Sequence, residues 1–299
     1  MSSLISSLRI GHYQCMRTLC SAVPQTKFLQ VSEPIANVVH VELNRPEIGN
    51  AFNIDLWREI KLVFEHLATY SQCRSVVLSG AGKSFSVGLD LKSGVAELLQ
   101  ILESKELDVA RKSWRLQKSI QLCQESFSAL EKCPKPVIAA VHSHCIGAAI
   151  NLITSADVRY ASSDTNFSIR EVKVGIIADV GVLNRINKLV GNDSFVREYA
   201  LTGRDFGSAE ALKLGLISRI FPDKKSCLEG SLALASEIAA NSPIAVQGTK
   251  LTLNYARDHS VEDSLTFVRL MNQSQLQNED MMKAASAVLS KKQVEFRDV

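Results

Sequence analysis

The stretch Pro136-Val137-Ile138-Ala139-Ala140-Val141, followed by Cys145-Ile146-Gly147-Ala148-Ala149, contains the pattern that decides the fold. The uncharged run predicts a buried strand, and a glycine followed by small residues is typical of a helix start. The same pattern occurs earlier, where Val76-Val77-Leu78 leads into Ser79-Gly80-Ala81-Gly82. Repetition of strand, loop and helix predicts an α/β fold in which crossover helices join parallel strands.

Other segments extend this architecture. The apolar residues of 38–43 predict a strand that ends at the turn formed by Asn44-Arg45-Pro46. Asn53 then suits the N-cap of a helix, because apolar residues recur after it at helical spacing. Beyond Pro222 the pattern predicts helices with no sheet to cover, at 228–240, 243–256 and 261–277.

The segment between Asp90 and Cys133 is polar and helix-prone, with one tryptophan, Trp114. We expect it to cover a functional site as a mobile segment. The alternative is an ordinary pair of surface helices.

Composition excludes several classes of function. The chain has 299 residues, of which 46% are hydrophobic, and can bury a large core. Its net charge of +3, without a stripe of lysine and arginine, argues against a nucleic-acid partner. The 7 cysteines lack metal-binding spacing and indicate free thiols in a reducing compartment. No apolar run is long enough to span a membrane.

The N-terminal segment has the composition of a transit peptide. Its first acidic residue is Glu33, and serines and basic residues precede it. The sequence ends at Arg297-Asp298-Val299, which is not a Ser-Lys-Leu type of peroxisomal address. We therefore expect residues 1–30 to be a mitochondrial transit peptide or, alternatively, a disordered leader. The mitochondrial matrix is the expected location, ahead of the peroxisome.

Glu171 and Asp179 are the candidate catalytic residues. The segment around them is otherwise apolar and includes Val174, Ile176, Ile177 and Val180. Burial among such residues raises the pKa of a carboxyl, so one acid could stay protonated while the other acts as a base. The alternative is a pair of solvated acids, or ion pairs with Arg170 and Lys173. The pattern favours proton transfer.

Two loops suit the binding of an oxyanion. Val87-Gly88-Leu89-Asp90 contains a glycine that lets the main chain bend, and small residues open the helix at Gly147-Ala148-Ala149. If the N–H groups of Leu89 and Ala148 converge on one carbonyl oxygen, they would stabilise an enolate. Ordinary loops with no active site are the alternative. A phosphate-binding loop at 80–84 is disfavoured because Val77 stands where that motif needs glycine.

Several motifs together resemble the enoyl-CoA hydratase/isomerase, or crotonase, superfamily over about residues 30–290. They are Asn44-Arg45-Pro46, Asn50-Ala51, Phe85-Ser86-Val87-Gly88-Leu89-Asp90-Leu91, Pro134 to Val141, Ala156-Asp157-Val158-Arg159-Tyr160 and Ala209-Glu210-Ala211. Within the superfamily the chain is most similar to dienoyl-CoA isomerases. This narrower resemblance rests on Glu171 to Gly175, Ala178-Asp179-Val180-Gly181 and Arg257-Asp258-His259-Ser260-Val261.

The resemblance implies a crotonase-like spiral of β-β-α turns in residues 31–222. It implies a helical C-terminal region, 223–299, that supports oligomerisation into homotrimers or homohexamers. It further implies conversion of a 3,5-dienoyl-CoA into a 2,4-dienoyl-CoA in the β-oxidation of unsaturated fatty acids. The substrate is a fatty acyl-CoA thioester, coenzyme A is part of that substrate, and no metal or other cofactor is expected.

The resemblance also assigns roles to residues of this chain. The thioester would lie along Val87, Gly88, Leu89, Asp90 and Leu91, with its oxygen held by the N–H groups of Leu89 and Ala148. Glu171 and Asp179 match the two proton-transferring carboxylates.

Two departures from the family pattern leave alternatives open. Related isomerases carry aspartate, and hydratases glutamate, where this chain has Asn151, which can form hydrogen bonds but cannot titrate. Ala148-Ala149 replaces paired glycines. We expect Asn151 to have a supporting role. The alternatives are a 2-enoyl-CoA hydratase or Δ3-Δ2-enoyl-CoA isomerase, and a catalytically inactive acyl-CoA-binding homologue.

Overall fold

The computed structural model describes residues 17–18, 23–290 and 294–299. Most of the expected transit peptide lies outside these residues. The larger sheet has the strand order β1-β2-β3-β4-β5-β7-β10. Strands β3, β4, β5, β7 and β10 run parallel to one another, whereas β2 pairs antiparallel with both β1 and β3. Its strands are β1 (Arg17–Thr18), β2 (Leu29–Ile35), β3 (Val38–Leu43), β4 (Ser75–Gly80), β5 (Val137–Val141), β7 (Val158–Ser162) and β10 (Arg219–Phe221). The predicted parallel α/β architecture is confirmed.

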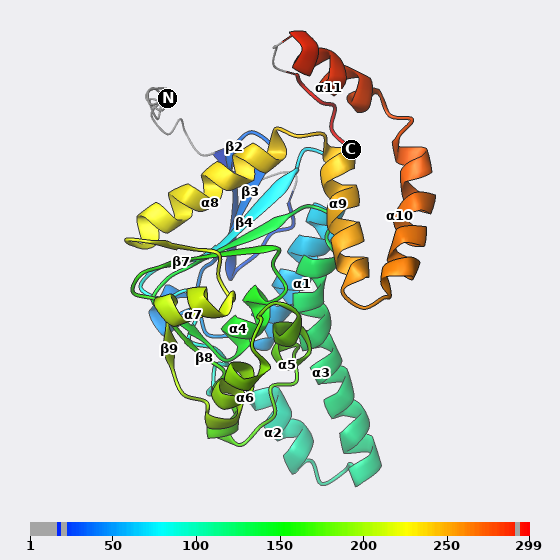
Figure 1. The fold of residues 1–299 in the computed structure, drawn as a ribbon. Coiled ribbons are helices and arrows are strands. Elements are labelled where there is room, and N and C mark those ends of the chain that lie inside the picture. Colours follow the sequence, from blue (N-terminus) through cyan, green and yellow to red (C-terminus); the bar gives the residue numbers. More distant parts are fainter. Residues whose placement is uncertain (1–16, 19–22, 291–293) are drawn as a thin grey trace.

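The larger sheet is buried on both faces at its centre, which explains why the central strands β4 and β5 carry no charged residue. In β5, Val137, Ala139 and Val141 face the cluster that includes α1 (Ile54–Thr69) and α3 (Val109–Lys132). Ile138 and Ala140 face the opposite cluster, which includes α8 (Lys224–Ala239). Figure 1 shows α8 across one face of the sheet. The expectation of C-terminal helices with no sheet to cover is therefore wrong for α8.

A second, smaller sheet contains β6 (His144–Ile146), β8 (Asn166–Ser168) and β9 (Phe206–Gly207). Isolated bridges pair Ser86 with Cys145 and Phe52 with Leu89, and so continue the line of this sheet. Each passage of the chain thus adds a strand to the larger sheet, a short extended segment to the second layer and then a helix. This order is the expected succession of β-β-α turns.

Short helical elements connect these layers. They are η1 (Pro46–Ile48), α2 (Ala96–Glu103), α4 (Ala148–Ile153), η2 (Glu171–Val174), α5 (Val182–Arg185), η3 (Ile186–Lys188), α6 (Asp193–Thr202) and α7 (Ser208–Leu214). The predicted N-cap is confirmed, because the Asn53 side chain accepts a hydrogen bond from the Leu56 N–H at 2.9 Å. Helices at 96–103 and 109–132 confirm the helical character of the segment after Asp90.

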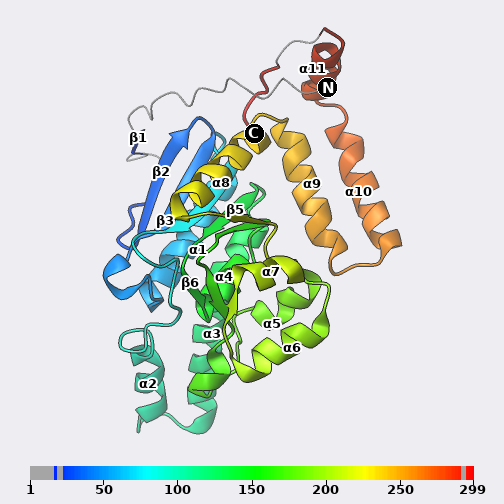
Figure 2. The ribbon, with the colours of Figure 1, turned by 60° about the vertical axis from the view of Figure 1, so that its left-hand side comes forward.

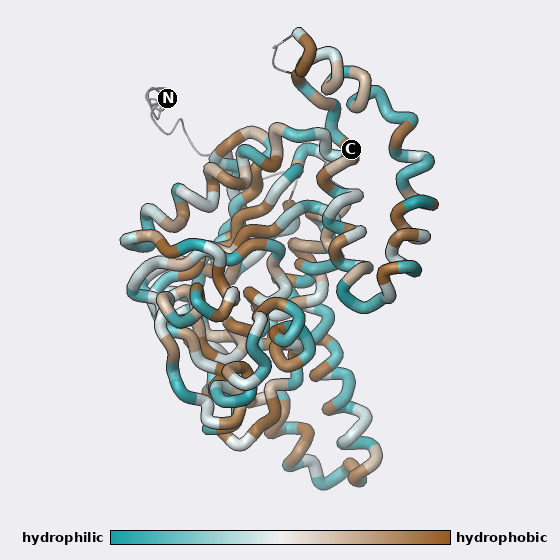
Figure 3. The backbone as a smooth tube through the Cα atoms, viewed as in Figure 1, coloured by the Kyte–Doolittle hydropathy of each residue, from teal (hydrophilic) through white to brown (hydrophobic). Residues whose placement is uncertain are grey.

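The C-terminal helices after α8 are α9 (Pro243–Ala256), α10 (Val261–Gln275) and α11 (Glu279–Ser290). Figure 2 shows them together at one side of the molecule, away from α2. Figure 3 shows apolar positions along α10 and α11. Several apolar side chains there are exposed, including Val261, Leu265 and Leu270 of α10. Within the described residues, no helix has the length and apolar character needed to cross a membrane.

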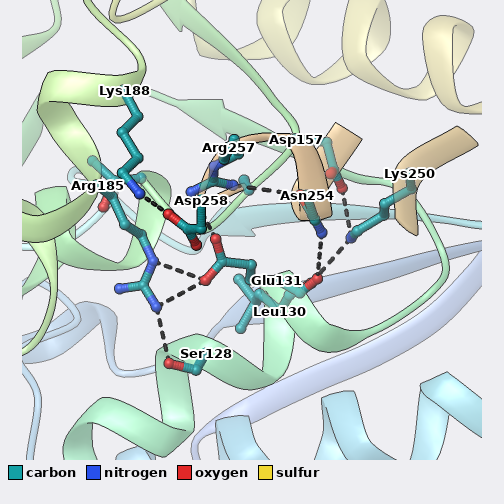
Figure 4. Close-up of polar contacts among 12 residues, drawn as sticks. Ser128, Leu130, Glu131, Asp157, Arg185, Lys188, Lys250, Asn254, Arg257 and Asp258 are labelled. Atoms are coloured by element: carbon teal, nitrogen blue, oxygen red, sulfur yellow. Dashed lines mark hydrogen bonds and ion pairs between the residues drawn. The ribbon is translucent and has the colours of Figure 1, made fainter. Parts of the chain in front are cut away.

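An ion-pair network attaches α9 and its C-terminal end to the core (Figure 4). Glu131 of α3 binds the guanidinium groups of Arg185 at 3.0 Å and Arg257 at 2.7 Å. Lys250 is buried and binds Asp157 at 2.7 Å. These contacts fix α9 on α3 and α5, behind the segment that carries Asp179.

Candidate active site

Two loops are held side by side by main-chain hydrogen bonds. The Ser86 N–H donates to the His144 carbonyl at 2.9 Å, and the Ile146 N–H donates to the Ser86 carbonyl at 3.1 Å. Gly88 has φ +92°, and a Cβ added there would lie 2.7 Å from the Ile146 oxygen. That same position is 3.6 Å from the Ala148 nitrogen, so the Gly88 loop passes directly beside the start of α4.

The N–H groups of Leu89 and Ala148 are available to a ligand. Ala148 is the first residue of α4, where a helix leaves N–H groups without an intrahelical acceptor. Across residues 17–18, 23–290 and 294–299, neither N–H donates a hydrogen bond. Together with the close approach of the two loops, this arrangement fits the expected oxyanion site.

A cavity of about 360 Å³ lies against these loops. Val87, Gly88, Leu89 and Leu91 line it on one side, and Gly147, Ala148 and Glu171 line it on another. Helices α2 and α3 add further lining residues, among them Glu97, Leu98, Ser119, Ile120 and Cys123. The segment after Asp90 therefore forms a wall of the cavity, which fits the expected cover. Its mobility stays a prediction.

Glu171 is buried at the wall of this cavity. A Cβ added to Gly147 would lie 3.7 Å from Glu171 Oε1, so the carboxyl is next to the helix start that carries the Ala148 N–H. Oε1 accepts a hydrogen bond from Asn151 Nδ2 at 2.9 Å, whereas Oε2 is buried and has no hydrogen-bond partner among the described residues. Burial raises the pKa of Glu171, and the charge of Asp179 raises it further. These are properties of a candidate general base.

Asp179 lies near Glu171 but is more accessible. The residue is exposed, and its main-chain carbonyl accepts a hydrogen bond from Gln124 Nε2 at 2.7 Å. Partial burial of its carboxyl nevertheless raises the pKa of Asp179. Burial and, to a smaller extent, the charge of Asp179 raise the pKa of Cys123, which lines the cavity. Asp179 itself is not among the lining residues, although Val180 is.

The apolar segment between the two acids is not buried as expected. Val174, Ile176 and Ile177 are 51%, 44% and 75% exposed. Val174 and Ile176 line the cavity, so they would contact a bound ligand and do not cover the two acids. The raised pKa of Glu171 comes instead mainly from the burial of its own carboxyl, which contacts Asn151 of α4.

Asp90 supports the loop with its carboxylate and does not line the cavity. Burial alone would raise the pKa of Asp90. Hydrogen bonds from Ser93, the Lys92 N–H and Arg45 outweigh that effect and lower the pKa to about 2. Arg45 is itself buried and lies 3.3 Å from the Asp90 carboxylate. The expected role in substrate binding is thus accompanied by a structural one.

Replacing Asp90 with asparagine is expected to lower the free energy of unfolding in a pH-dependent way. Because the folded pKa lies below the ordinary value of about 3.9, the ionised group stabilises the fold above that value. This stabilisation is lost as the pH falls towards 2. We expect a loss of about 2 kcal/mol at pH 7, and of about half that at pH 3.

Urea unfolding at the two pH values measures this difference. The control is Asp55→Asn, which alters an exposed acid paired with Arg58 and should change stability by at most about 0.5 kcal/mol. An equal loss for Asp90→Asn at both pH values would rule out this origin of the stabilisation.

Two further residues of the family motifs, Ser86 and Asn50, contribute to the site in ways that the sequence analysis did not predict. Ser86 donates to the Asn50 carbonyl at 2.8 Å and accepts from the Gly88 N–H at 3.2 Å, which shapes the oxyanion loop. Asn50 is buried with φ +56° and donates to the Ala81, Ser84 and Phe85 carbonyls. Both side chains form contacts distant in sequence, so their roles do not follow from spacing.

Comparison with known proteins identifies what this chain resembles. A family model described as enoyl-CoA hydratase/isomerase matches residues 33–299. A mitochondrial Δ(3,5)-Δ(2,4)-dienoyl-CoA isomerase of Pongo abelii is 48% identical over 266 residues, covering 89% of this chain and 80% of that protein. The mitochondrial protein of that name from Dictyostelium discoideum is 37% identical, and the match covers 93% of this chain and 96% of that protein. A peroxisomal Δ(3,5)-Δ(2,4)-dienoyl-CoA isomerase from Arabidopsis thaliana is 39% identical, and the match covers 87% of this chain and 93% of that protein.

Solved structures share the fold. A probable enoyl-CoA hydratase/isomerase from Mycobacterium abscessus has a TM-score of 0.78 at 30% identity, covering 91% of this chain and 99% of the other. An enoyl-CoA hydratase from Bacillus anthracis has a TM-score of 0.81 at 23% identity, with the same coverage, and shows the fold alone. The expected spiral fold is confirmed.

Proposed function

The chain belongs to the enoyl-CoA hydratase/isomerase family, and from this premise we propose that it converts a 3,5-dienoyl-CoA into the conjugated 2,4-dienoyl-CoA. The reaction belongs to the β-oxidation of unsaturated fatty acids. It moves a proton from C2 to C6 without redox change, so coenzyme A enters only as part of the substrate.

One observation carries this proposal. The Glu171 carboxyl lies next to Gly147, at the start of the helix whose first N–H is unoccupied, and both line the same cavity. A thioester oxygen bound by the Ala148 and Leu89 N–H groups would place C2, the neighbouring carbon, beside Glu171. Removal of a C2 proton then gives a dienolate whose negative charge is stabilised by these N–H groups.

Asp179 is the proposed proton donor to C6. Partial burial raises the pKa of Asp179, and the charge of Asp179 raises the pKa of Glu171, so ionisation of one acid disfavours ionisation of the other. One ionised and one protonated carboxyl is the state that the reaction needs. After each turnover Glu171 holds the proton taken from C2 and Asp179 has lost one. The cycle closes when Glu171 releases its proton to solvent and the exposed Asp179 takes one up from water.

An assay with two substrates tests the proposed activity. The purified protein should form the 2,4-dienoyl chromophore from a 3,5-dienoyl-CoA, whereas hydration of crotonyl-CoA should be slower by at least about 100-fold. Hydration uses two acids around one water, and the family's second acid is replaced here by Asn151, which cannot titrate. Appreciable hydration without dienoyl turnover would favour a hydratase. Tight CoA-ester binding without any product would favour an inactive homologue.

The remaining expectations are part of this proposal. We place the protein in the mitochondrial matrix because of the composition of residues 1–30 and because several relatives are named mitochondrial. We assign residues 31–222 to the catalytic core and 223–299 to a helical region for assembly into a homotrimer or homohexamer. Exposed apolar side chains on α10 support that assignment, although α8 packs on the sheet.

A further inference from the structure

Asn151 is a fully buried amide on α4 that satisfies three groups at once. Its Oδ1 accepts a hydrogen bond from the Val182 N–H at 2.7 Å. Its Nδ2 donates to the Gly147 carbonyl at 3.1 Å and to Glu171 Oε1 at 2.9 Å. The orientation of the amide is determined, because the Val182 N–H can donate only to the oxygen.

These three contacts join the parts of the proposed site. Gly147 precedes the Ala148 N–H, Glu171 is the proposed base, and Val182 is the first residue of α5, three positions after Asp179. One side chain therefore sets the position of the oxyanion loop relative to both acids. Asn151 is absent from the cavity lining, so its influence passes through the groups that it binds.

The neutral amide also determines how Glu171 presents its carboxyl. Oε1 is held by Asn151, and Oε2 is buried without a partner in the part of the chain that the structure describes, which leaves Oε2 as the oxygen able to take a proton. An ionised carboxylate in place of the amide would accept where the amide donates. Two carboxylates about 3 Å apart hold one proton between them, which raises the pKa of the pair.

Few charged groups compete with this effect. Asp179 acts on Glu171 from the following segment, and Glu97, Cys123 and Arg170 share its cavity. On the opposite side, an adjoining cavity lined by Glu171 also contains Asp193 and Arg197, which bind each other. Arg170 is bound to Asp205. A new negative charge at position 151 would be the nearest to Glu171.

We propose that Asn151 is a positioning residue that holds Glu171 as an ionised base and aligns its carboxyl with the oxyanion loop and the Asp179 segment. This inference rests on the proposed function. It assigns the amide a specific purpose, so the departure from the acidic residue of the family is a working feature of this site.

The test compares Asn151→Ala and Asn151→Asp across a pH series of kcat/KM for dienoyl-CoA isomerisation. Asn151→Ala should lower kcat/KM about 10- to 100-fold at every pH, because it removes a hydrogen bond to a charged group. Asn151→Asp should be up to about tenfold slower on the acidic limb of the profile and should recover as the pH rises. The added charge raises the pKa of Glu171, so the acidic limb of the profile moves upward by about one unit.

Asn184 provides the matched control. It lies on α5, is exposed and forms no side-chain hydrogen bond within the described part of the chain. Asn184→Ala and Asn184→Asp should leave both the rate and the profile unchanged. If Asn151→Ala fails to fold, the pH profile of Asn151→Asp alone tests the inference. That variant should fold, since aspartate can still accept a hydrogen bond from the Val182 N–H.

An Asn151→Asp profile superimposable on that of the wild type would overturn the inference. So would a wild-type rate in a folded Asn151→Ala protein. Absence of dienoyl turnover in the unmodified protein would instead contradict the proposed function, so the two failures are distinguishable.

Discussion

Glu171→Gln is expected to lower kcat for dienoyl-CoA isomerisation by about 10³- to 10⁴-fold, the upper part of the range for general acid–base groups. Glutamine keeps the size of the side chain and an oxygen that can accept from Asn151 Nδ2. It cannot take up a proton from C2. Formation of the 2,4-dienoyl chromophore under saturating substrate measures the loss.

A second acid of the same cavity supplies the control for this variant. Glu97 also lines the cavity, but it lies on α2, and no atom of Glu97 is among the nearest neighbours of Gly147. Glu97→Gln should change kcat by less than about threefold, and both variants should bind a non-reactive CoA thioester as the wild type does. Retention of more than about a tenth of the wild-type kcat by Glu171→Gln would exclude Glu171 as the base.

Ala148→Pro is expected to lower kcat by about 10²- to 10³-fold, the usual effect of losing one oxyanion donor. Proline removes the N–H, and its ring carbon occupies the position of that proton. The helix should survive, because Ala148 is the first residue of α4 and proline is well tolerated there. The loss should appear mainly in kcat, since the N–H bonds strengthen as negative charge develops on the oxygen.

Val261→Pro makes the same change at a distant helix. Val261 is the first residue of α10 and is 77% exposed. This variant should keep wild-type kcat, which separates loss of the donor from a general effect of proline. A folded Ala148→Pro protein with undiminished kcat would remove the Ala148 N–H from the mechanism.

Much of the fold was predictable from the sequence, because the local pattern of apolar residues agrees with how each strand and helix is buried. The apolar residues of β5 alternate between two buried faces, so an uncharged run correctly indicates a central parallel strand. The predicted helix at 243–256 agrees with α9, where Pro243 occupies the first helical position. For α8 the pattern gave the helix but not its packing partner, since contact with the sheet depends on strands far away in sequence.

The candidate site was predictable only in part. The glycine-containing loops indicated where main-chain N–H groups are unoccupied, because such loops follow from local sequence. Apolarity of the segment between Glu171 and Asp179 did not indicate burial, since Ile177 is largely exposed. The contact of Asn151 with Val182 links residues from separate turns of the spiral, so only the three-dimensional structure reveals it.

Transfer of hydrogen between C2 and C6 by two acids is the central claim, and reaction in D₂O tests it most directly. Wild type, Glu171→Gln and Asp179→Asn would be incubated with a 3,5-dienoyl-CoA, with chromophore formation and deuterium at C2 followed together. Asp179→Asn should lose the chromophore but still exchange the C2 hydrogen, because Glu171 can form the dienolate. Glu171→Gln should lose both. Wild-type turnover by Asp179→Asn, or undiminished C2 exchange by Glu171→Gln, would contradict the account.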